Sequence, residues 1–363
     1  MKAYIGSILL MAVAFGLALT TVSARPQDQA DQNRGLPWAY GFAMPAPPGG
    51  APEAGRGGAP AGGRGAAGRG AAAAAPAEPA EDREAIHHLP GTNNAFAIKD
   101  IANNYAPADW YPSDHPAMPD IVAHGRKPEV NACGFCHYPN GRGRPNNAGP
   151  AGLPKAYILQ QLQDFKDGSR NTADKRKRNE TQMIAIAKAL TPEEAQAAAG
   201  YFSSMKWTTY EKVVETSTVP KAEYVGGGGG LCMPLTGDKA GTEPIGDRLV
   251  EVPANPEATE PLRDPRATYI AYVPPGTLKK GKAIVDGANG RKACASCHGK
   301  GLKGHDDYPE IAGRSPSYLA RQINDFKQMT RNGPGAEKMR PIVANLSDDD
   351  ILAVAAYVAS LKP

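Results

Sequence analysis

The sequence predicts an all-α protein in which one small helical domain occurs twice. Residues 133–170 align with 294–331 without a gap at an offset of 161 residues, and 183–205 align with 339–361 at an offset of 156. Apolar residues recur at helical spacing in both copies, whereas segments with the alternating pattern of a strand are nearly absent. A chain of 363 residues has room for two such domains.

The first 24 residues have the layout of a secretory signal peptide. Lys2 supplies the charged start, 5–19 are apolar, and 22–24 are the small residues of a cleavage site. The alternative, a single membrane anchor, is disfavoured because the apolar run is short for a span. We therefore expect an exported, periplasmic protein without a membrane span after cleavage.

Residues 25–105 are expected to form a disordered tether. The chain contains 41 Gly and 34 Pro, and 45–85 are especially rich in Pro, Ala and Gly. Three Gly-Arg-Gly copies could suggest RNA binding, but an exported chain does not meet RNA, and the net charge of +4 is small. No nucleic-acid partner is expected.

The domains are expected at 106–207 and 273–363, joined by a long, partly irregular segment at 208–272. Central helices are predicted at 157–166 and 318–327, and another at 278–286. The C-terminal helix of each copy has a clear start, Thr191-Pro192-Glu193-Glu194 in the first and Ser347-Asp348-Asp349-Asp350 in the second.

Both copies contain the pattern Cys-x-x-Cys-His, as Cys133-Gly134-Phe135-Cys136-His137 and as Cys294-Ala295-Ser296-Cys297-His298. This pattern is typical of c-type haem attachment: each thiol bonds one vinyl group and the histidine binds the iron. A redox dithiol would need a βαβ pattern, and a zinc site a second ligand pair nearby; neither is present. We therefore expect two covalently bound haem c groups.

Each iron then needs a sixth ligand. Met183 and Met339 occupy equivalent positions, both shortly before the start of a helix. A thioether favours ferrous iron and so raises the reduction potential. Met205, Met233 and Met329 are interpreted as packing residues, while His115 or His124 could take the place of Met183.

On these residues, both copies resemble class I cytochrome c domains, and the chain is similar to exported two-haem c-type cytochromes. The resemblance implies covalent attachment at Cys133, Cys136, Cys294 and Cys297, with His137, Met183, His298 and Met339 as axial ligands. It also implies a proline carbonyl that accepts a hydrogen bond from each histidine. Pro309 fits this role, whereas the first copy has Ala148 at the aligned position.

The expected function is electron transfer between redox proteins, without catalysis by the chain itself. With both axial positions filled, no iron site is open to a substrate. One alternative is a haem enzyme, a peroxidase or a sulfur-compound oxidase. Another is a cytochrome subunit of a dehydrogenase complex, with 208–272 as its docking element.

Two features have no counterpart in the minimal domain. The joining segment contains 248–252 and 269–273, which could be short strands, and Cys232, which could be buried and inert, paired with another chain, or a functional thiolate. The first copy also has a loop five residues longer, with the run Lys175-Arg176-Lys177-Arg178. We expect this run either to be a solvated loop or to steer an acidic partner to the first haem.

Overall fold

The structure, a computed structural model, describes residues 35–44, 82–226 and 228–363. The chain divides into two units, Met1–Arg34 and Gly35–Pro363, and the described residues all belong to the second. The expected signal peptide and residues 45–81 of the expected tether lie outside them. Within the described residues, no helix has the length and apolar character needed to cross a membrane.

The first copy is helical, as expected. Its helices are α4 (Asp120–Ala123), α5 (Cys133–His137), α6 (Lys155–Asp167), α7 (Arg178–Ala189) and α8 (Pro192–Ser203). The start of α8 is a complete capping box, because the Thr191 hydroxyl accepts from the Glu194 N–H and the Glu194 carboxylate accepts from the Thr191 N–H. Val122, Val130 and Phe202 lie in the core that α8 covers.

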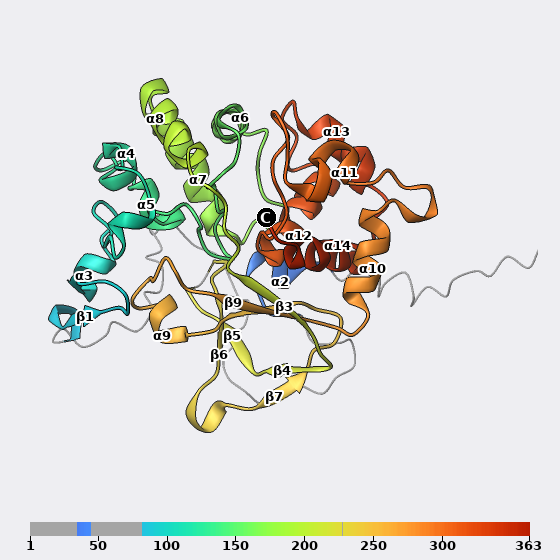
Figure 1. Cartoon of the computed structure of the whole chain (residues 1–363), viewed down its shortest axis with the longest axis horizontal. Coiled ribbons are helices and arrows are strands. Elements are labelled where there is room, and N and C mark those ends of the chain that lie inside the picture. Colours follow the sequence, from blue (N-terminus) through green and yellow to red (C-terminus); the bar gives the residue numbers. More distant parts are fainter. Residues whose placement is uncertain (1–34, 45–81, 227) are drawn as a thin grey trace, which may run out of the picture. The chain divides into compact units, whose positions relative to one another are not determined.

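The second copy repeats this order. Its helices are α10 (Thr277–Val285), α11 (Ala295–His298), α12 (Pro316–Lys327), α13 (Ala336–Val343) and α14 (Asp348–Ser360) (Figure 1). Ser347 and Asp350 form the equivalent capping box. Helix α14 is almost entirely buried and crosses α10 at Gly281, where an added Cβ would lie 2.0 Å from the Ala353 carbonyl oxygen. Only glycine allows this close approach.

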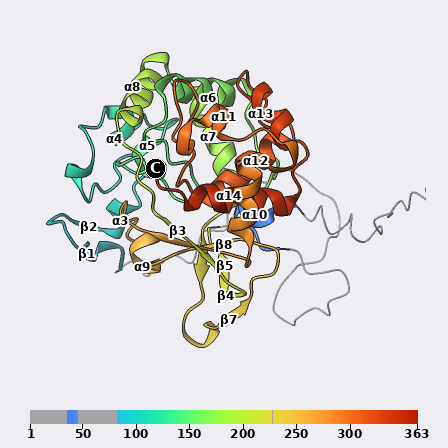
Figure 2. The same ribbon diagram turned by 45° about the vertical axis from the view of Figure 1, so that its right-hand side comes forward.

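The expectation of an all-α protein is wrong for the described residues. A three-stranded sheet has the order β3 (Glu211–Glu215), β9 (Tyr269–Val273), β8 (Val250–Pro253), with β3 parallel and β8 antiparallel to β9 (Figures 1 and 2). Three antiparallel pairs are β1 (Ile86–His88) with β2 (Ala95–Ala97), β4 (Thr218–Pro220) with β7 (Thr242–Pro244), and β5 (Ala222–Tyr224) with β6 (Cys232–Pro234). The expected strands at 248–252 and 269–273 correspond to β8 and β9. Most of the other strands have only three residues, too few to show a period.

Two parts of the expected tether, 35–44 and 82–105, are folded, so the prediction of disorder is wrong for them. Residues 35–44 contain α2 (Pro37–Tyr40), whose Trp38 and Tyr40 are buried against α12. The Tyr40 hydroxyl donates to Asp325 Oδ1 at 2.8 Å. Residues 82–105 contain β1, β2 and α3 (Ile98–Ile101), which pack around the fully buried Trp110. Short 3₁₀ turns and one further helix complete the described elements: η1 (Asp82–Glu84), η2 (Pro112–Asp114), η3 (Gly237–Lys239), α9 (Pro256–Thr259), η4 (Ala288–Gly290) and η5 (Lys300–Leu302).

The β3–β9–β8 sheet contains a buried carboxylate pair. On β8, Glu251 accepts from the Ser315 hydroxyl at 2.7 Å and from the Ser317 N–H at 3.1 Å, at the start of α12. On β3, both carboxylate oxygens of Glu211 are buried without a partner among the described residues. Burial and the nearby Glu251 raise the pKa of Glu211 well above its ordinary value. Glu211 therefore keeps its proton to a higher pH than an exposed glutamate does.

This burial predicts how stability depends on pH. The unfolded chain releases the Glu211 proton near pH 4.5, whereas the folded protein retains it to higher pH. The folded state therefore loses stability as the pH rises above that value. Glu211→Gln cannot ionise, so it should be more stable than the parent protein at pH 7 and similar to it below about pH 4. Thermal unfolding followed by circular dichroism across this pH range measures the difference. The exposed Glu223→Gln should follow the parent curve, and the same curve for Glu211→Gln would contradict the assignment.

Candidate functional site

Both Cys-x-x-Cys-His motifs lie on short helices, and in both the histidine ring is fixed by one backbone carbonyl. The His137 Nδ1–H donates to the Ala148 oxygen at 2.8 Å, and the His298 Nδ1–H donates to the Pro309 oxygen at 2.9 Å. The expected role of Pro309 is thus in place, and Ala148 does the same in the first copy. With Nδ1 engaged, Nε2 is the ring atom left to bind a metal.

The environment of both rings favours the neutral form that metal binding requires. Burial lowers the pKa of His137, and the nearby Arg170 adds to the effect. Burial also lowers the pKa of His298. Each motif therefore presents an uncharged imidazole whose orientation is set before any ligand arrives.

The cysteines of the motifs do not have the character of a redox dithiol. Burial raises the pKa of the Cys133 thiol to about 12, and it also raises the pKa of Cys136 and Cys294. Reactive cysteines have lowered pKa values because the thiolate is the nucleophile. The described residues also contain no group of three or more His, Cys, Asp or Glu side chains that could hold a metal ion. A zinc site would need such a group.

The candidate methionines lie on equivalent helices. Met183 is half-buried on α7, and Met339 is half-buried on α13 against the core of its copy. The alternative ligand His115 has both ring nitrogens engaged, with Asp109 Oδ1 at 3.2 Å and the Pro116 oxygen at 2.8 Å. This leaves His115 no free nitrogen for iron. His124, the other alternative, is exposed.

The residues around the first motif fit a group that carries carboxylates, as haem does. Three donors there are buried and form no hydrogen bond among the described residues: Tyr138 Oη, Arg144 Nε and Arg170 Nε, the last with the Glu180 carboxylate 4.0 Å away. Tyr138 directly follows the motif histidine, and the charges of Arg144 and Arg170 act on Cys136 and His137 respectively. An unpaired buried donor is costly, and an anionic ligand would satisfy it.

The two copies contact each other through matched residues. Arg170 and Arg331, which are equivalent in the alignment, face each other in an antiparallel β-bridge. The Asn171 N–H donates to the Thr330 oxygen at 2.7 Å, and the Asn332 N–H donates to the Ser169 oxygen at 2.6 Å. The backbone contact is therefore nearly two-fold symmetric.

At this contact, one arginine from each copy forms hydrogen bonds to both copies. Arg170 donates to Gln161 of its own copy at 2.9 Å and to Gln322 of the other at 2.8 Å. Arg331 donates to Gln322 at 3.1 Å and to Gln161 at 2.7 Å. It also donates to the Tyr157 hydroxyl at 2.6 Å. Both arginines are buried. Arg314 and Arg321 of the second copy add hydrogen bonds to the Ala151 and Pro145 oxygens of the first, at 3.1 and 3.3 Å.

The basic run of the first copy is only partly available to a partner. Lys177 is buried, at 1 % exposure, and donates to the Gly229 oxygen at 2.8 Å. Arg176 pairs with Asp174 at 2.6 Å and stacks on Phe42 at 4.1 Å from the ring centre. The expectation of four basic residues facing a partner is therefore wrong for Lys177, because its ammonium group lies against Gly229.

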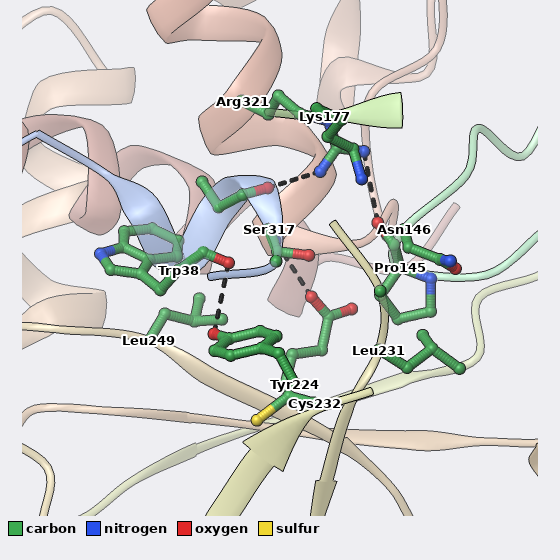
Figure 3. Close-up of a pocket in the computed structure, with 14 residues that line it drawn as sticks. Trp38, Pro145, Asn146, Lys177, Tyr224, Leu231, Cys232, Leu249, Ser317 and Arg321 are labelled. Atoms are coloured by element: carbon green, nitrogen blue, oxygen red, sulfur yellow. Dashed lines mark hydrogen bonds between the residues drawn. The ribbon is translucent and has the colours of Figure 1, made fainter. Parts of the chain in front are cut away.

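Cys232 lies on β6 in the wall of a cavity of about 20 Å³, together with Tyr224 and Leu249 (Figure 3). That volume holds about one water molecule. A larger hollow of about 470 Å³ also has Cys232 in its wall. The side chain is buried, and burial raises the pKa of the thiol to about 12. Of the three interpretations of this cysteine, these observations favour the inert one.

The hydrogen bonds of Arg170 and Arg331 lead to a prediction about how the two copies unfold. Arg331→Ala removes the donor to the Tyr157 hydroxyl and one of the two donors to each of Gln161 and Gln322. The free energy of unfolding should therefore fall by about 2–4 kcal/mol. The single calorimetric transition expected for the parent protein should separate into two, because each copy has its own core. Lys166→Ala, an exposed change on the neighbouring α6, should leave the transition unchanged. An unaltered transition in Arg331→Ala would show that the copies do not depend on this contact.

Comparison with known proteins assigns the family. Residues 122–206 match the model for cytochrome c, and 278–358 match the model for subunit III of cbb3-type cytochrome c oxidase. Cytochrome c-554(548) of Halomonas halodenitrificans is 38% identical over 68 residues, which are 18% of this chain and 82% of that protein.

Two longer relatives extend over both copies. Cytochrome c4 of Stutzerimonas stutzeri is 25% identical over 241 residues, 64% of this chain and 86% of that protein. The thiosulfate dehydrogenase electron acceptor of Thiomonas intermedia (strain K12) is 27% identical over 236 residues, 64% of this chain and 80% of that protein. The chain therefore belongs to the c-type cytochromes, as an electron-transfer protein with two covalently bound haem c groups.

Proposed function

We propose that the chain is a periplasmic electron carrier in which each copy holds one haem through its own motif. Cys133 and Cys136 bond the first haem, and Cys294 and Cys297 bond the second. The axial ligands are His137 with Met183 and His298 with Met339. The observation that carries the proposal is the equivalent pairing of His137 and His298 with a backbone carbonyl, which leaves Nε2 free in both copies.

The haem supplies one-electron chemistry, and the chain controls its access and its potential. The carbonyls of Ala148 and Pro309 orient the imidazoles and increase their strength as donors. The thioethers of Met183 and Met339 favour the reduced state. With a histidine and a methionine as ligands, each iron would have no position open to a substrate, so the chain would relay electrons.

The contact between the copies supports an internal relay. Arg170 and Arg331 hold the two copies in one relative orientation through hydrogen bonds of 2.6–3.1 Å. A fixed separation between the haems keeps the rate of transfer between them constant, since that rate falls steeply with distance. Electrons can then pass between the two haems at a defined rate.

A dehydrogenase is the donor that the comparisons favour. One relative is named as the electron acceptor of a thiosulfate dehydrogenase, and we propose that this chain likewise accepts electrons from an enzyme that oxidises a small substrate. The oxidation itself belongs to that enzyme. The protonated, buried thiol of Cys232 is unsuited to attack a sulfur compound.

The methionine ligands are tested by substitution. Met183→Ala and Met339→Ala should each remove half of the near-infrared methionine–iron absorption and lower the potential of one haem by on the order of 0.2 V. Absorption spectra and a redox titration of the holoprotein measure both effects. The control is Met329→Ala, because Met329 is 53% exposed. A variant at 183 or 339 with an unchanged spectrum would show that another residue binds that iron.

Covalent attachment is tested separately. Replacing Cys133 and Cys136 with Ala should leave one covalently bound haem per chain, as should replacing Cys294 and Cys297, because each copy holds its haem independently. Cys232→Ser should retain two. Acidified-acetone extraction followed by mass spectrometry of the chain gives the count. Two bound haems in either double variant would contradict the assignment of the motifs.

A further inference from the structure

A segment of the joining region lies directly on the first haem motif. This segment, the cover, comprises residues 256–266, which are α9 and the loop after it. The Arg263 guanidinium donates to the Phe135 carbonyl and stacks on the Phe135 ring, 4.1 Å from its centre. Phe135 stands between the two cysteines of the motif. The cover therefore contacts the residues that carry the haem bonds.

Three further residues after the motif contact the cover. Asn140 Nδ2 donates to the Pro265 oxygen at 2.9 Å, and an Arg142 guanidinium nitrogen donates to the same oxygen at 3.1 Å. Arg144 pairs with Glu260 at 3.0 Å. The cover is thus attached along the whole stretch 135–144.

Residues of the segment 82–114 also hold the cover in place. Trp110 is fully buried and its Nε1–H donates to the Leu262 oxygen at 2.8 Å. Arg266 forms a two-bonded pair with Asp114, both bonds at 2.7 Å, and stacks on Tyr111 at 3.7 Å. The segment 82–114 therefore braces the cover against the first copy, so the cover is part of the fold.

The second copy has no equivalent of the cover among the described residues. The positions that align with Phe135, Asn140, Arg142 and Arg144 are Ser296, Gly301, Lys303 and His305. All four are exposed, whereas the first-copy residues are all buried or half-buried. The same stretch of sequence is therefore shielded in one copy and open to solvent in the other.

The open stretch is basic. Lys292, Lys300 and Lys303 are exposed around it, and Lys292 and Lys300 form no ion pair in the described part of the chain. Asp306 and Asp307 are exposed further along, so the lysines outnumber the acids. Together these exposed residues form the second-motif face, which consists of Lys292, 295–296, Lys300 and Lys303.

We infer that the external redox partner is an acidic electron-transfer protein that docks on the second-motif face, and that the first haem exchanges electrons with it through the second haem. The inference rests on the proposed function, which supplies the haems. Electron transfer needs a short distance between partners, and the cover prevents that approach at the first motif. Unpaired lysines attract an acidic protein and orient its encounter.

The rival docking surface is the basic run beside Met183. Of its four residues, Lys177 is buried and Arg176 is paired with Asp174. Lys175 and Arg178 remain exposed. Lys175 and Arg178 provide a matched control for Lys292 and Lys300, because two exposed positive charges are reversed in each pair.

The experiment compares Lys292→Glu/Lys300→Glu with Lys175→Glu/Arg178→Glu in the oxidised holoprotein. Reduced flavodoxin, a strongly acidic one-electron donor, is the probe, and stopped-flow absorbance gives the rate of haem reduction at low and high salt. The second-motif variant should react about fivefold more slowly at low salt and lose most of its salt dependence. The matched variant should stay within about twofold of the parent protein. Equal slowing in both variants, slowing only in the matched variant, or no slowing in either would overturn the inference.

Two further measurements complete the test. A cationic oxidant, tris(phenanthroline)cobalt(III), should react faster with the reduced second-motif variant, because the sign of the interaction reverses; a slower reaction would mean a damaged site and contradict steering. The haem count and the methionine–iron absorption of each variant are measured in parallel. Two intact haems with unchanged rates would refute the docking inference alone, whereas fewer than two haems in the parent protein would refute the proposed function.

Discussion

Two buried arginines at the centre of the contact, Arg170 and Arg331, hold the two copies together by bonding to both. Each reaches the glutamine of its own copy and the glutamine of the other, so neither copy can rotate without breaking charge-assisted hydrogen bonds in a buried place. Each also stacks on the phenylalanine of its own central helix, at 4.4 and 4.3 Å. A duplicated domain thus forms, within one chain, the self-complementary contact that a symmetric dimer forms between two chains.

Segments outside the duplication break this symmetry. The β3–β9–β8 sheet contacts the start of α12 through Glu251, and the cover that precedes β9 lies on the first motif. The first copy therefore has added protein over its motif, whereas in the second copy the added segments, α2 and the sheet, pack on α12 and α14. Duplication provides two equivalent metal sites, and the added segments give them different surroundings. In a relay this difference is useful, because two identical sites would give an electron no preferred direction.

The parts that the sequence predicts well are those set by local pattern. The capping boxes at Thr191 and Ser347 mark helix starts because side chain and backbone meet within three residues. The partner of His137 was less certain from the sequence, since Ala148 replaces the expected proline. The acceptor is a backbone oxygen, however, so the side chain at that position does not matter.

The parts that the sequence does not predict depend on distant contacts. Strand β3 pairs with β9, which lies more than fifty residues later, and so has little local signal. Trp38 and Tyr40 stand beside a Pro/Ala/Gly-rich stretch whose composition indicated disorder. These two aromatic side chains indicate that the segment is buried, and they lie in the core of the second copy.

The cover affects energy as well as access. Ferric haem carries one more positive charge than ferrous haem, and a less solvated site disfavours the more charged state. The cover brings Arg263 beside the first motif, and it also brings Glu260, whose carboxylate pairs with Arg144 at 3.0 Å, so these added charges largely compensate one another. The second motif keeps its exposed residues and hence more of its hydration. With the haems bound as proposed, lower hydration would favour the reduced state at the first motif relative to the second, without any change in the ligands of either iron.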